Sequence, residues 1–256
     1  MNIEIVIPLG NGDPRQDMPN SSLLEFTCKN VKEQTIPVKL TFAIDKNLKV
    51  EKKNIIDKYA DQIHVYDQEA SYYAPGGIWL KIYESWEKSN CDYVAWSGYD
   101  DFSSPDRFEK QYKKITEENG NSCFCNSYRH VNGKEIIANS SHSAKFNLGK
   151  HTLFMGAFLL KRESILSSGI DAHKYKWSAY FEGLLNSYII KQGKIHRSQG
   201  KFFYREHSGT LSNTCQEFNE WVKKEREKTN YSAEEAQRDW DSINFNKLNE
   251  DIRRGT

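Results

Sequence analysis

The 256-residue chain lacks long hydrophobic runs and the cysteine patterns of metal-binding or disulfide-rich domains. No segment approaches the roughly 18 consecutive apolar residues that a membrane-spanning helix needs. The five cysteines are scattered, and no two of them form the Cys-x-x-Cys pair typical of zinc sites. The formal net charge is +1, so no overall attraction to nucleic acid or to an anionic membrane is expected. These absences favour a cytoplasmic protein with reduced thiols.

Aromatic residues are abundant, at 13% of the chain, and strand and helix signals alternate through the first half. Apolar segments typical of buried strands alternate there with amphipathic segments typical of surface helices. The predicted strands are 3–7, 38–45, 63–66 and 93–96, followed later by 122–128, 153–160 and 202–205; the predicted helices are 21–33, 54–59 and 78–86. This alternation predicts an α/β fold with a mostly parallel sheet flanked by helices.

The composition changes near residue 213, where a highly charged segment punctuated by aromatic residues begins. We expect a helical carboxyl-terminal extension over residues 213–256, after a main domain over residues 1–212. Lysine and arginine residues in this extension could approach a nucleic-acid acceptor, with aromatic stacking in support. Acidic residues balance them, which favours a solvent-exposed helix face instead.

The most informative segment is the pair Asp100-Asp101, which follows the apolar strand 93–96. Open α/β sheets bind ligands at the carboxyl ends of their strands. Two adjacent carboxylates at that edge supply the hard oxygen ligands that suit Mg²⁺ or Mn²⁺ carrying a diphosphate. The alternative is an ordinary turn rich in aspartate. The following residues 104–106, Ser-Pro-Asp, predict the start of a helix with a cap residue and a proline at its first position.

Four segments, taken in order, resemble the GT-A fold glycosyltransferases, and especially the large inverting family of nucleotide-sugar transferases. The segments are Ile5-Val6-Ile7-Pro8, the turn and strand from Val31 to Asp45, the acidic segment from Asp100 to Phe108, and Tyr204 to Ser212, which is similar to the family ending "YR-x-H-x-G-S-x-S". The resemblance implies a GT-A (Rossmann-like) domain. Its expected activity is the transfer of a sugar from a nucleoside-diphosphate sugar to an acceptor hydroxyl, assisted by a metal ion and with inversion.

The resemblance also implies where a UDP- or GDP-linked donor binds. By the family pattern, Pro8 and Gly10 line the base, and Asp45 holds the base or the ribose. Gly76 and Gly77 resemble the loop that crosses the nucleotide. The alternative for Asp45 is a turn residue at the end of a strand, and for the two glycines a plain turn before a helix.

A divalent cation, Mn²⁺ or Mg²⁺, is implied at Asp100, Asp101 and His207. The family usually has Asp-x-Asp-Asp, whereas Gly98 stands here at the first aspartate position, so that contact is missing or supplied elsewhere. Asp100 is the retained ligand, and Asp101 is either a second ligand or holds the following turn. The imidazole of His207 suits Mn²⁺ better than Mg²⁺, unless it is a structural hydrogen-bonding residue. Arg205 would pair with a phosphate through its planar guanidinium.

Inverting transfer needs a carboxylate that takes the proton from the acceptor hydroxyl. The family spacing, counted back from Gly193, places Glu182 at the base position, after an aromatic acceptor wall that includes Trp177 and Tyr180. Gly156 resembles a small residue that leaves space for the acceptor, which is a glycan or another hydroxyl compound. The alternatives are a surface residue in the first turn of a helix for Glu182 and a bulge in a buried strand for Gly156.

Two other classes of function stay open. A sugar-phosphate nucleotidyltransferase uses a related sheet, but that class carries a glycine-rich loop with Arg and Lys after the first strand. Residues 9–19 contain a single Arg15 and no Lys. A non-catalytic nucleotide-sugar or glycan binding module would account for Gly98 and for the unusual Phe181-Glu182 pair. Hydrolysis of a nucleotide sugar would distinguish the enzyme from the binding module.

Overall fold

The computed structural model describes residues 2–10, 21–46, 48, 50–67, 75–131, 134–136, 155–167, 169 and 195–206. The strands are β1 (Ile3–Leu9), β2 (Lys39–Asp45), β3 (Gln62–Tyr66), β4 (Tyr93–Trp96), β5 (Phe102–Ser103), β6 (Ser122–Val131), β7 (Lys134–Ile136), β8 (Phe158–Lys161) and β9 (Ile195–Glu206). The helices are α1 (Ser21–Lys32), α2 (Val50–Tyr59), α3 (Pro75–Lys88), α4 (Arg107–Glu117) and α6 (Arg162–Leu166), and η2 (Met155–Ala157) is a 3₁₀ turn.

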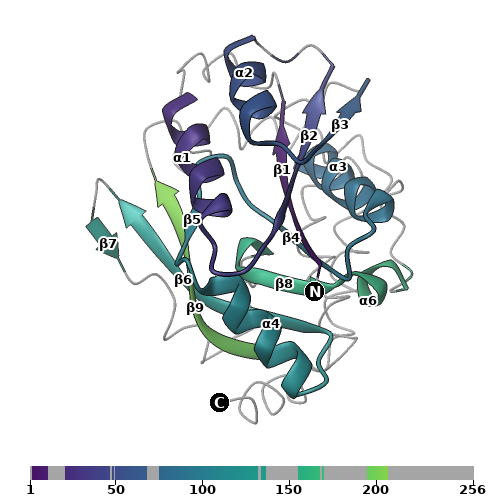
Figure 1. Cartoon of the computed structure of the whole chain (residues 1–256), viewed down its shortest axis with the longest axis vertical. Helices are drawn as coiled ribbons and strands as arrows, with labels where there is room; N and C mark the ends of the chain where they lie inside the picture. The colour runs from purple at the N-terminus through teal and green to yellow at the C-terminus, as the bar shows by residue number, and fades with distance from the viewer. Residues whose placement is uncertain are drawn as a thin grey trace, which may run out of the picture.

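The described strands form one nine-stranded sheet in the order β3-β2-β1-β4-β8-β6-β9-β5, with β7 paired to β6 (Figure 1). The first four strands are all parallel. β8 is antiparallel to both of its neighbours, β9 is parallel to β6, and β5 is antiparallel to β9. The α/β fold class predicted from the sequence is confirmed, with parallel pairing in the first half and mixed pairing in the second.

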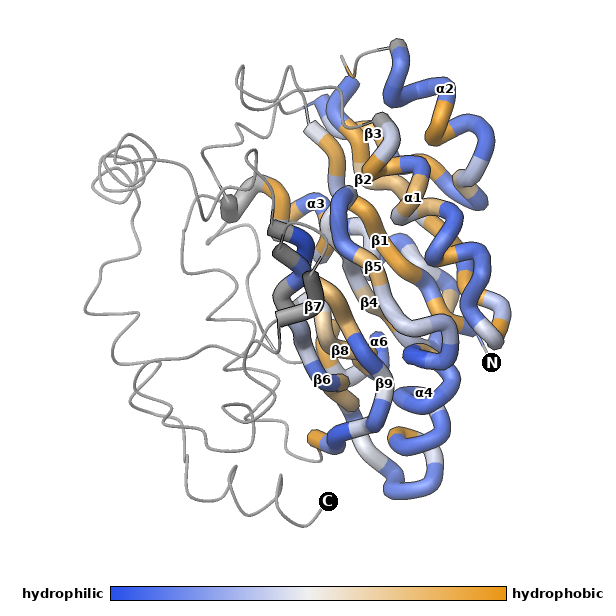
Figure 2. The backbone as a smooth tube through the Cα atoms, turned by 90° about the vertical axis from the view of Figure 1, so that its left-hand side faces the viewer, coloured by the Kyte–Doolittle hydropathy of each residue, from blue (hydrophilic) through white to orange (hydrophobic). Residues whose placement is uncertain are grey.

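Helices cover both faces of the sheet, so the central strand β1 is buried on both sides (Figure 2). One core contains every second residue of β1, from Ile3 to Leu9, packed with residues of α1, α2 and α4. The other core contains Val6 and the apolar face of α3 around Trp86. This arrangement explains why β1 reads as an almost continuous apolar run, as strands buried on both faces do.

Two further sequence predictions concern the carboxyl-terminal extension and membrane-spanning helices. The helical extension predicted over residues 213–256 lies outside the described residues. Across the part of the chain that the structure describes, every helix is too short or too polar to cross a membrane.

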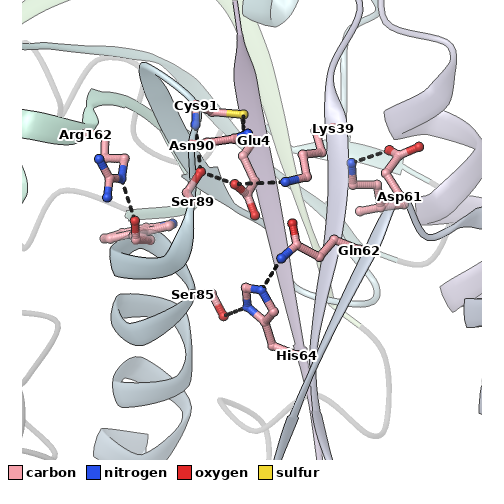
Figure 3. Close-up of polar contacts among 12 residues, drawn as sticks. Glu4, Lys39, Asp61, Gln62, His64, Ser85, Ser89, Asn90, Cys91 and Arg162 are labelled. Carbon is pink, nitrogen blue, oxygen red and sulfur yellow. Dashed lines mark hydrogen bonds and ion pairs between the residues drawn. The ribbon is translucent and has the colours of Figure 1, made fainter.

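A buried polar network lies on the α3 side of the sheet, near the amino ends of β1 and β2 (Figure 3). Glu4 is fully buried, and its carboxylate accepts a hydrogen bond from the Ser89 hydroxyl and pairs with Lys39 Nζ at 4.0 Å. In β3, His64 Nδ1 lies 3.1 Å from Ser85 Oγ, and burial lowers the pKa of His64. Polar groups in a core must be paired to offset their desolvation; here Ser85 joins α3 to β3, Ser89 joins the residue after α3 to β1, and Glu4 joins β1 to β2.

Helix α4 begins later than the sequence pattern predicted, because Ser104-Pro105-Asp106 forms a turn before it. Asp106 occupies the cap position without a side-chain cap hydrogen bond. The Ser104 hydroxyl instead donates to the Asp106 carboxylate at 2.8 Å and accepts the backbone N–H of Lys201 at 3.1 Å. The Ser104 side chain, which the sequence pattern predicted to cap the helix, therefore binds the distant strand β9 instead.

Arg107, the first residue of α4, is buried and joins the helix to two other segments. Its guanidinium donates to Ser103 Oγ at 2.9 Å, to Gln111 Oε1 at 3.0 Å, and to the backbone carbonyls of Gly156 and Phe158. Gln111 donates to two further backbone carbonyls on β6 and η2. The two side chains thus fix the η2 turn and the start of β8 between α4 and β6.

We expect Arg107→Met to lower the free energy of unfolding by about 3 kcal/mol, because it leaves buried carbonyls without their charged donor. Urea unfolding measures this change. Lys110→Met is the matched control on the same helix, since Lys110 is exposed and forms a surface ion pair with the partly exposed Asp106; it should leave the unfolding free energy nearly unchanged. An equal loss in the two variants would contradict the structural role of Arg107.

Candidate functional site

The carboxyl ends of β1, β2 and β4 lie side by side at one edge of the sheet, where the nucleotide and cation residues were predicted. β1 is the middle strand, with Leu9 opposite Ile44 of β2 and Val6 opposite Trp96 of β4. In Figure 1 the arrowheads of β1, β2 and β3 point in the same direction. Adjacent strands lie about 4.8 Å apart, and β2 extends further along β1 than β4 does, because β4 ends opposite Val6 whereas Ile44 of β2 lies opposite Leu9.

Asp45, the last residue of β2, is buried and forms an ion pair with Lys81 of α3. Successive residues of a strand face opposite sides. Ala43 packs in the α3 core and Ile44 in the opposite one, which places Asp45 on the α3 side. Lys81 is also buried, and burial lowers its pKa to about 8. Asp45 is therefore a fixed internal group and not an exposed turn residue.

Sequence reasoning did not identify Lys81 as part of this site. The sequence feature that could have indicated it is a single lysine among the apolar residues Ile78 to Ile82, at the start of the predicted helix. Such a lysine is usually read as a surface residue whose stem covers apolar atoms. Its partner, Asp45, is 36 positions away in sequence, so only the packing of α3 on β2 brings the two charges together.

The other predicted nucleotide residues lie at the same edge. Pro8 lies near the end of β1, and Gly10 follows that strand directly. Gly76 and Gly77 lie in the first turn of α3 and not in a loop before it, because the helix begins one residue ahead of them. Since α3 packs against β1 and β2, the structure places this helix beside the strand that ends in Asp45.

The two acidic residues after β4 have different surroundings. Asp101 is only 2% exposed; its Oδ1 accepts the backbone N–H of Arg205 at 3.2 Å, and its backbone carbonyl accepts the Thr27 hydroxyl at 2.8 Å. Burial raises the pKa of Asp101 well above its ordinary value, and the charge of Asp100 raises it further, against the N–H groups of Arg205 and Gly98. Asp100 is only partly buried.

Gly98, which occupies the position of the expected first aspartate, lies against both carboxylates. A Cβ atom built there would be 2.6 Å from Asp101 Oδ2 and 3.0 Å from Asp100 Oδ1. An aspartate at this position would require the acidic pair to move. The departure from the family motif is thus linked to the conformation that Asp100 and Asp101 adopt.

The described residues supply Asp100 as a side chain suited to a divalent cation at this edge. Asp101 fits less well, because it is buried and already accepts an N–H group. Within the described ranges, no three His, Cys, Asp or Glu side chains are grouped closely enough to hold a metal ion. Four predicted site residues lie outside the described part of the chain: Trp177, Tyr180, Glu182 and His207.

Arg205, on β9, lies next to the acidic pair. Its guanidinium carbon lies 4.7 Å from the ring centroid of Phe26 in α1 and 5.1 Å from that of Phe102 in β5. Burial lowers the pKa of Arg205, and the negative charges of Asp100 and Asp101 oppose this shift. A fixed guanidinium and a partly exposed carboxylate thus lie near each other at the end of β4.

Gly156 lies in the η2 turn, whereas the sequence pattern placed it inside a strand; β8 begins at Phe158. A Cβ atom at Gly156 would be 2.6 Å from Cζ of Phe202, so the ring of Phe202 fills the space that was predicted to admit an acceptor. Packing alone therefore accounts for this glycine. The ring belongs to β9, which the sequence could not place against this turn.

Comparison with known proteins finds similarity in fold and not in sequence. No protein-family model matches the chain, and no curated protein matches it in sequence. The structure of S. aureus TarS 1-349 in complex with UDP superposes with a TM-score of 0.60 at 11% identity, covering 94% of this chain and 70% of that one. The complex of the same fragment with UDP-GlcNAc gives a TM-score of 0.58 at 11% identity, with 99% and 74% covered.

A third structure, of S. aureus TarS, gives a TM-score of 0.61 at 11% identity and is matched over 45% of its length by 96% of this chain. TarS is a glycosyltransferase, so these likenesses show that the chain has a glycosyltransferase-like fold. At this identity the likeness is one of fold alone.

We expect Lys81→Met to destabilise the protein by about 3 kcal/mol, because Asp45 stays buried without its ion-pair partner. The double variant Asp45→Leu/Lys81→Met should recover much of this loss, since replacing both charges removes the desolvation cost. Unfolding free energies of the two single variants and the double variant form the cycle that measures the coupling. Additive effects would show that the two side chains do not interact.

Proposed function

We propose that this protein is a glycosyltransferase that moves a sugar from a UDP-linked donor to a hydroxyl group of a glycan or another acceptor. The observation that carries the proposal is the carboxyl edge of the parallel strands, which has buried Asp45 on one side and Asp100 beside Arg205 on the other. Ligands of open α/β sheets bind at this edge. The fold is shared with TarS, whose structures contain UDP and UDP-GlcNAc.

In this proposal the nucleoside lies over the end of β1. Pro8 and Gly10 line the base, and the Asp45 carboxylate accepts hydrogen bonds from the base or the ribose. Gly76 and Gly77 approach the nucleotide from the first turn of α3. The ion pair with Lys81 supports this role, because it holds the Asp45 carboxylate in a fixed position at the end of β2.

The diphosphate lies toward the end of β4, where Arg205 pairs with a phosphate oxygen through its planar guanidinium. Asp100, together with His207, would hold Mn²⁺ or Mg²⁺. Such a cation supplies positive charge that stabilises the departing diphosphate. Arg205 serves the same electrostatic purpose from the protein itself, since its charge is always present and its position is already set.

The acceptor side of the proposal depends on residues outside the described part of the chain. Glu182 takes the proton from the acceptor hydroxyl as the anomeric carbon is attacked from the opposite face, which inverts its configuration. Trp177 and Tyr180 form the aromatic wall on which the acceptor binds. The sequence resemblance supports these roles.

UDP binding in the presence of Mn²⁺, measured by isothermal titration calorimetry, tests the nucleotide site. We expect Asp100→Asn to weaken binding at least about tenfold, because the amide cannot supply the charge that a cation requires. Asp92→Asn is the matched control, since Asp92 is exposed and lies before β4, at the opposite end of the strand. Equal affinity of wild type and Asp100→Asn would contradict the proposed cation site.

Transfer activity tests the proposed base. Glu182→Gln should lower kcat by about 10²- to 10⁴-fold while leaving UDP affinity unchanged, because the amide cannot accept the acceptor proton. The readout is UDP released from a panel of UDP-sugars with hydroxyl acceptors. Glu163→Gln on the exposed face of α6 is the control and should retain full activity. A Glu182→Gln variant with wild-type kcat would place the base elsewhere.

A nucleotide-sugar binding module without transferase activity is the second candidate, favoured by Gly98 at the position of a family aspartate. It predicts UDP binding that depends on Asp45 and Asp100, with no UDP release from any donor. The calorimetric and turnover measurements together distinguish the two candidates.

A further inference from the structure

The side chain of Asp101 extends the pairing of two strands. β5 is antiparallel to β9, with Phe102 opposite Phe203. One residue before β5, the Asp101 carboxylate accepts the backbone N–H of Arg205 at 3.2 Å. A side-chain oxygen thus continues the contact between β5 and β9 at Arg205, beyond the last paired residue of β5.

Helix α1 holds the segment that carries Asp101 from the other side. Thr27 Oγ1 donates to the Asp101 carbonyl at 2.8 Å. Asn30 donates to the Ser103 carbonyl at 2.9 Å and accepts the Ser103 N–H at 2.8 Å. These three bonds fix the backbone of residues 101–103, so the Asp101 carboxylate has a defined position against β9.

The guanidinium of Arg205 lies against two aromatic rings, one from α1 and one from β5. It lies over Phe26 of α1 and Phe102 of β5, whose centroids are 5.5 Å apart in an edge-to-face pair. A cation over an aromatic face is stabilised by about 0.5–2 kcal/mol. Phe26 is 46% exposed, which is unusual for a phenylalanine, and its contact with Arg205 gives the exposed ring a role.

Gly98 permits this arrangement. The Asp101 carboxylate lies so close to Gly98 that a Cβ atom there would approach Oδ2 to 2.6 Å. A side chain at position 98 would therefore require the Asp101 carboxylate to shift from its present position next to Arg205. The position of the Asp101 carboxylate therefore depends on the absence of a side chain at Gly98.

We propose that Asp101 is a positioning residue for Arg205 and not a cation ligand, and that Gly98 is the residue that makes this role available. The inference rests on the proposed function in one respect, which is that Arg205 binds a phosphate group of the nucleotide. Asp100 is then the acidic residue of this pair that faces a cation. With glycine in place of the expected aspartate at position 98, the chain gives up one nucleotide contact and gains the contact by which Asp101 positions Arg205.

The dependence of UDP affinity on Mn²⁺ separates a positioning role from a ligand role. Asp101→Ala should weaken UDP binding about tenfold both with and without Mn²⁺, so the ratio of the two affinities stays at the wild-type value. Asp101→Asn keeps an oxygen that can accept the Arg205 N–H and should recover affinity to within about threefold. Asp100→Asn should instead abolish the Mn²⁺ enhancement. Asp92→Ala is the control for loss of a carboxylate at the opposite end of β4.

The alanine substitution at Gly98 gives an independent test with Asp101 left in place. Gly98→Ala should reproduce the loss seen in Asp101→Ala, because the added methyl group displaces the same carboxylate. Loss of the Mn²⁺ enhancement in Asp101→Asn, to the extent seen in Asp100→Asn, would overturn the proposal. Wild-type affinity in Gly98→Ala and Asp101→Ala would also overturn it.

Amide hydrogen exchange tests the same contact without any ligand. The Arg205 amide should exchange at least about tenfold faster in Asp101→Ala than in wild type, and Asp101→Asn should restore its protection. Unchanged protection in Asp101→Ala would overturn the positioning role. If wild type binds no UDP, the proposed function fails, and this measurement still decides whether Asp101 positions Arg205.

Discussion

The arrangement at the carboxyl edge depends on one partly buried hydrogen bond, which runs from the Arg205 N–H to the buried Asp101 carboxylate. Burying a carboxylate costs free energy unless donors replace the water that it loses. Because α1 holds the backbone of residues 101–103, this bond links a fixed segment to β9 beside the end of β4. The contact also favours a small residue at position 98, because a Cβ atom there would lie 2.6 Å from Asp101 Oδ2.

Buried charges also fix the rest of this edge. Asp45 is held by Lys81 across the α3 face, and Arg107 holds the η2 turn below β9 through backbone carbonyls. Each of these groups bears a desolvation cost that only its partners offset, so each partner pair has essentially one geometry. Rigid placement of this kind is what a site for a charged nucleotide needs, because the binding groups lose little freedom when the ligand arrives.

Local patterns predicted most elements of the fold, but several of their ends were misplaced: α2 begins at Val50 where residue 54 was predicted, and β9 begins at Ile195 where residue 202 was predicted. Apolar periodicity located β1, α1 and β3 to within about two residues, because burial of a strand or helix face repeats along the chain. The start of α4 was misplaced because Lys201 competes for Ser104. The role of Gly156 was misread because Phe202, which fills its space, lies 46 positions away. The sequence pattern drew attention to Asp100, Asp101 and Arg205, and the structure shows that their surroundings differ, since Asp101 is buried and Asp100 is only partly buried.

The most direct test of this account is a crystal structure of the protein with UDP and Mn²⁺. The account predicts that the uracil or ribose contacts Asp45 near the end of β1, and that the diphosphate lies between Asp100 and Arg205. It also predicts that the Asp101 carboxylate remains bonded to the Arg205 N–H. A nucleotide bound away from this edge would contradict the central claim.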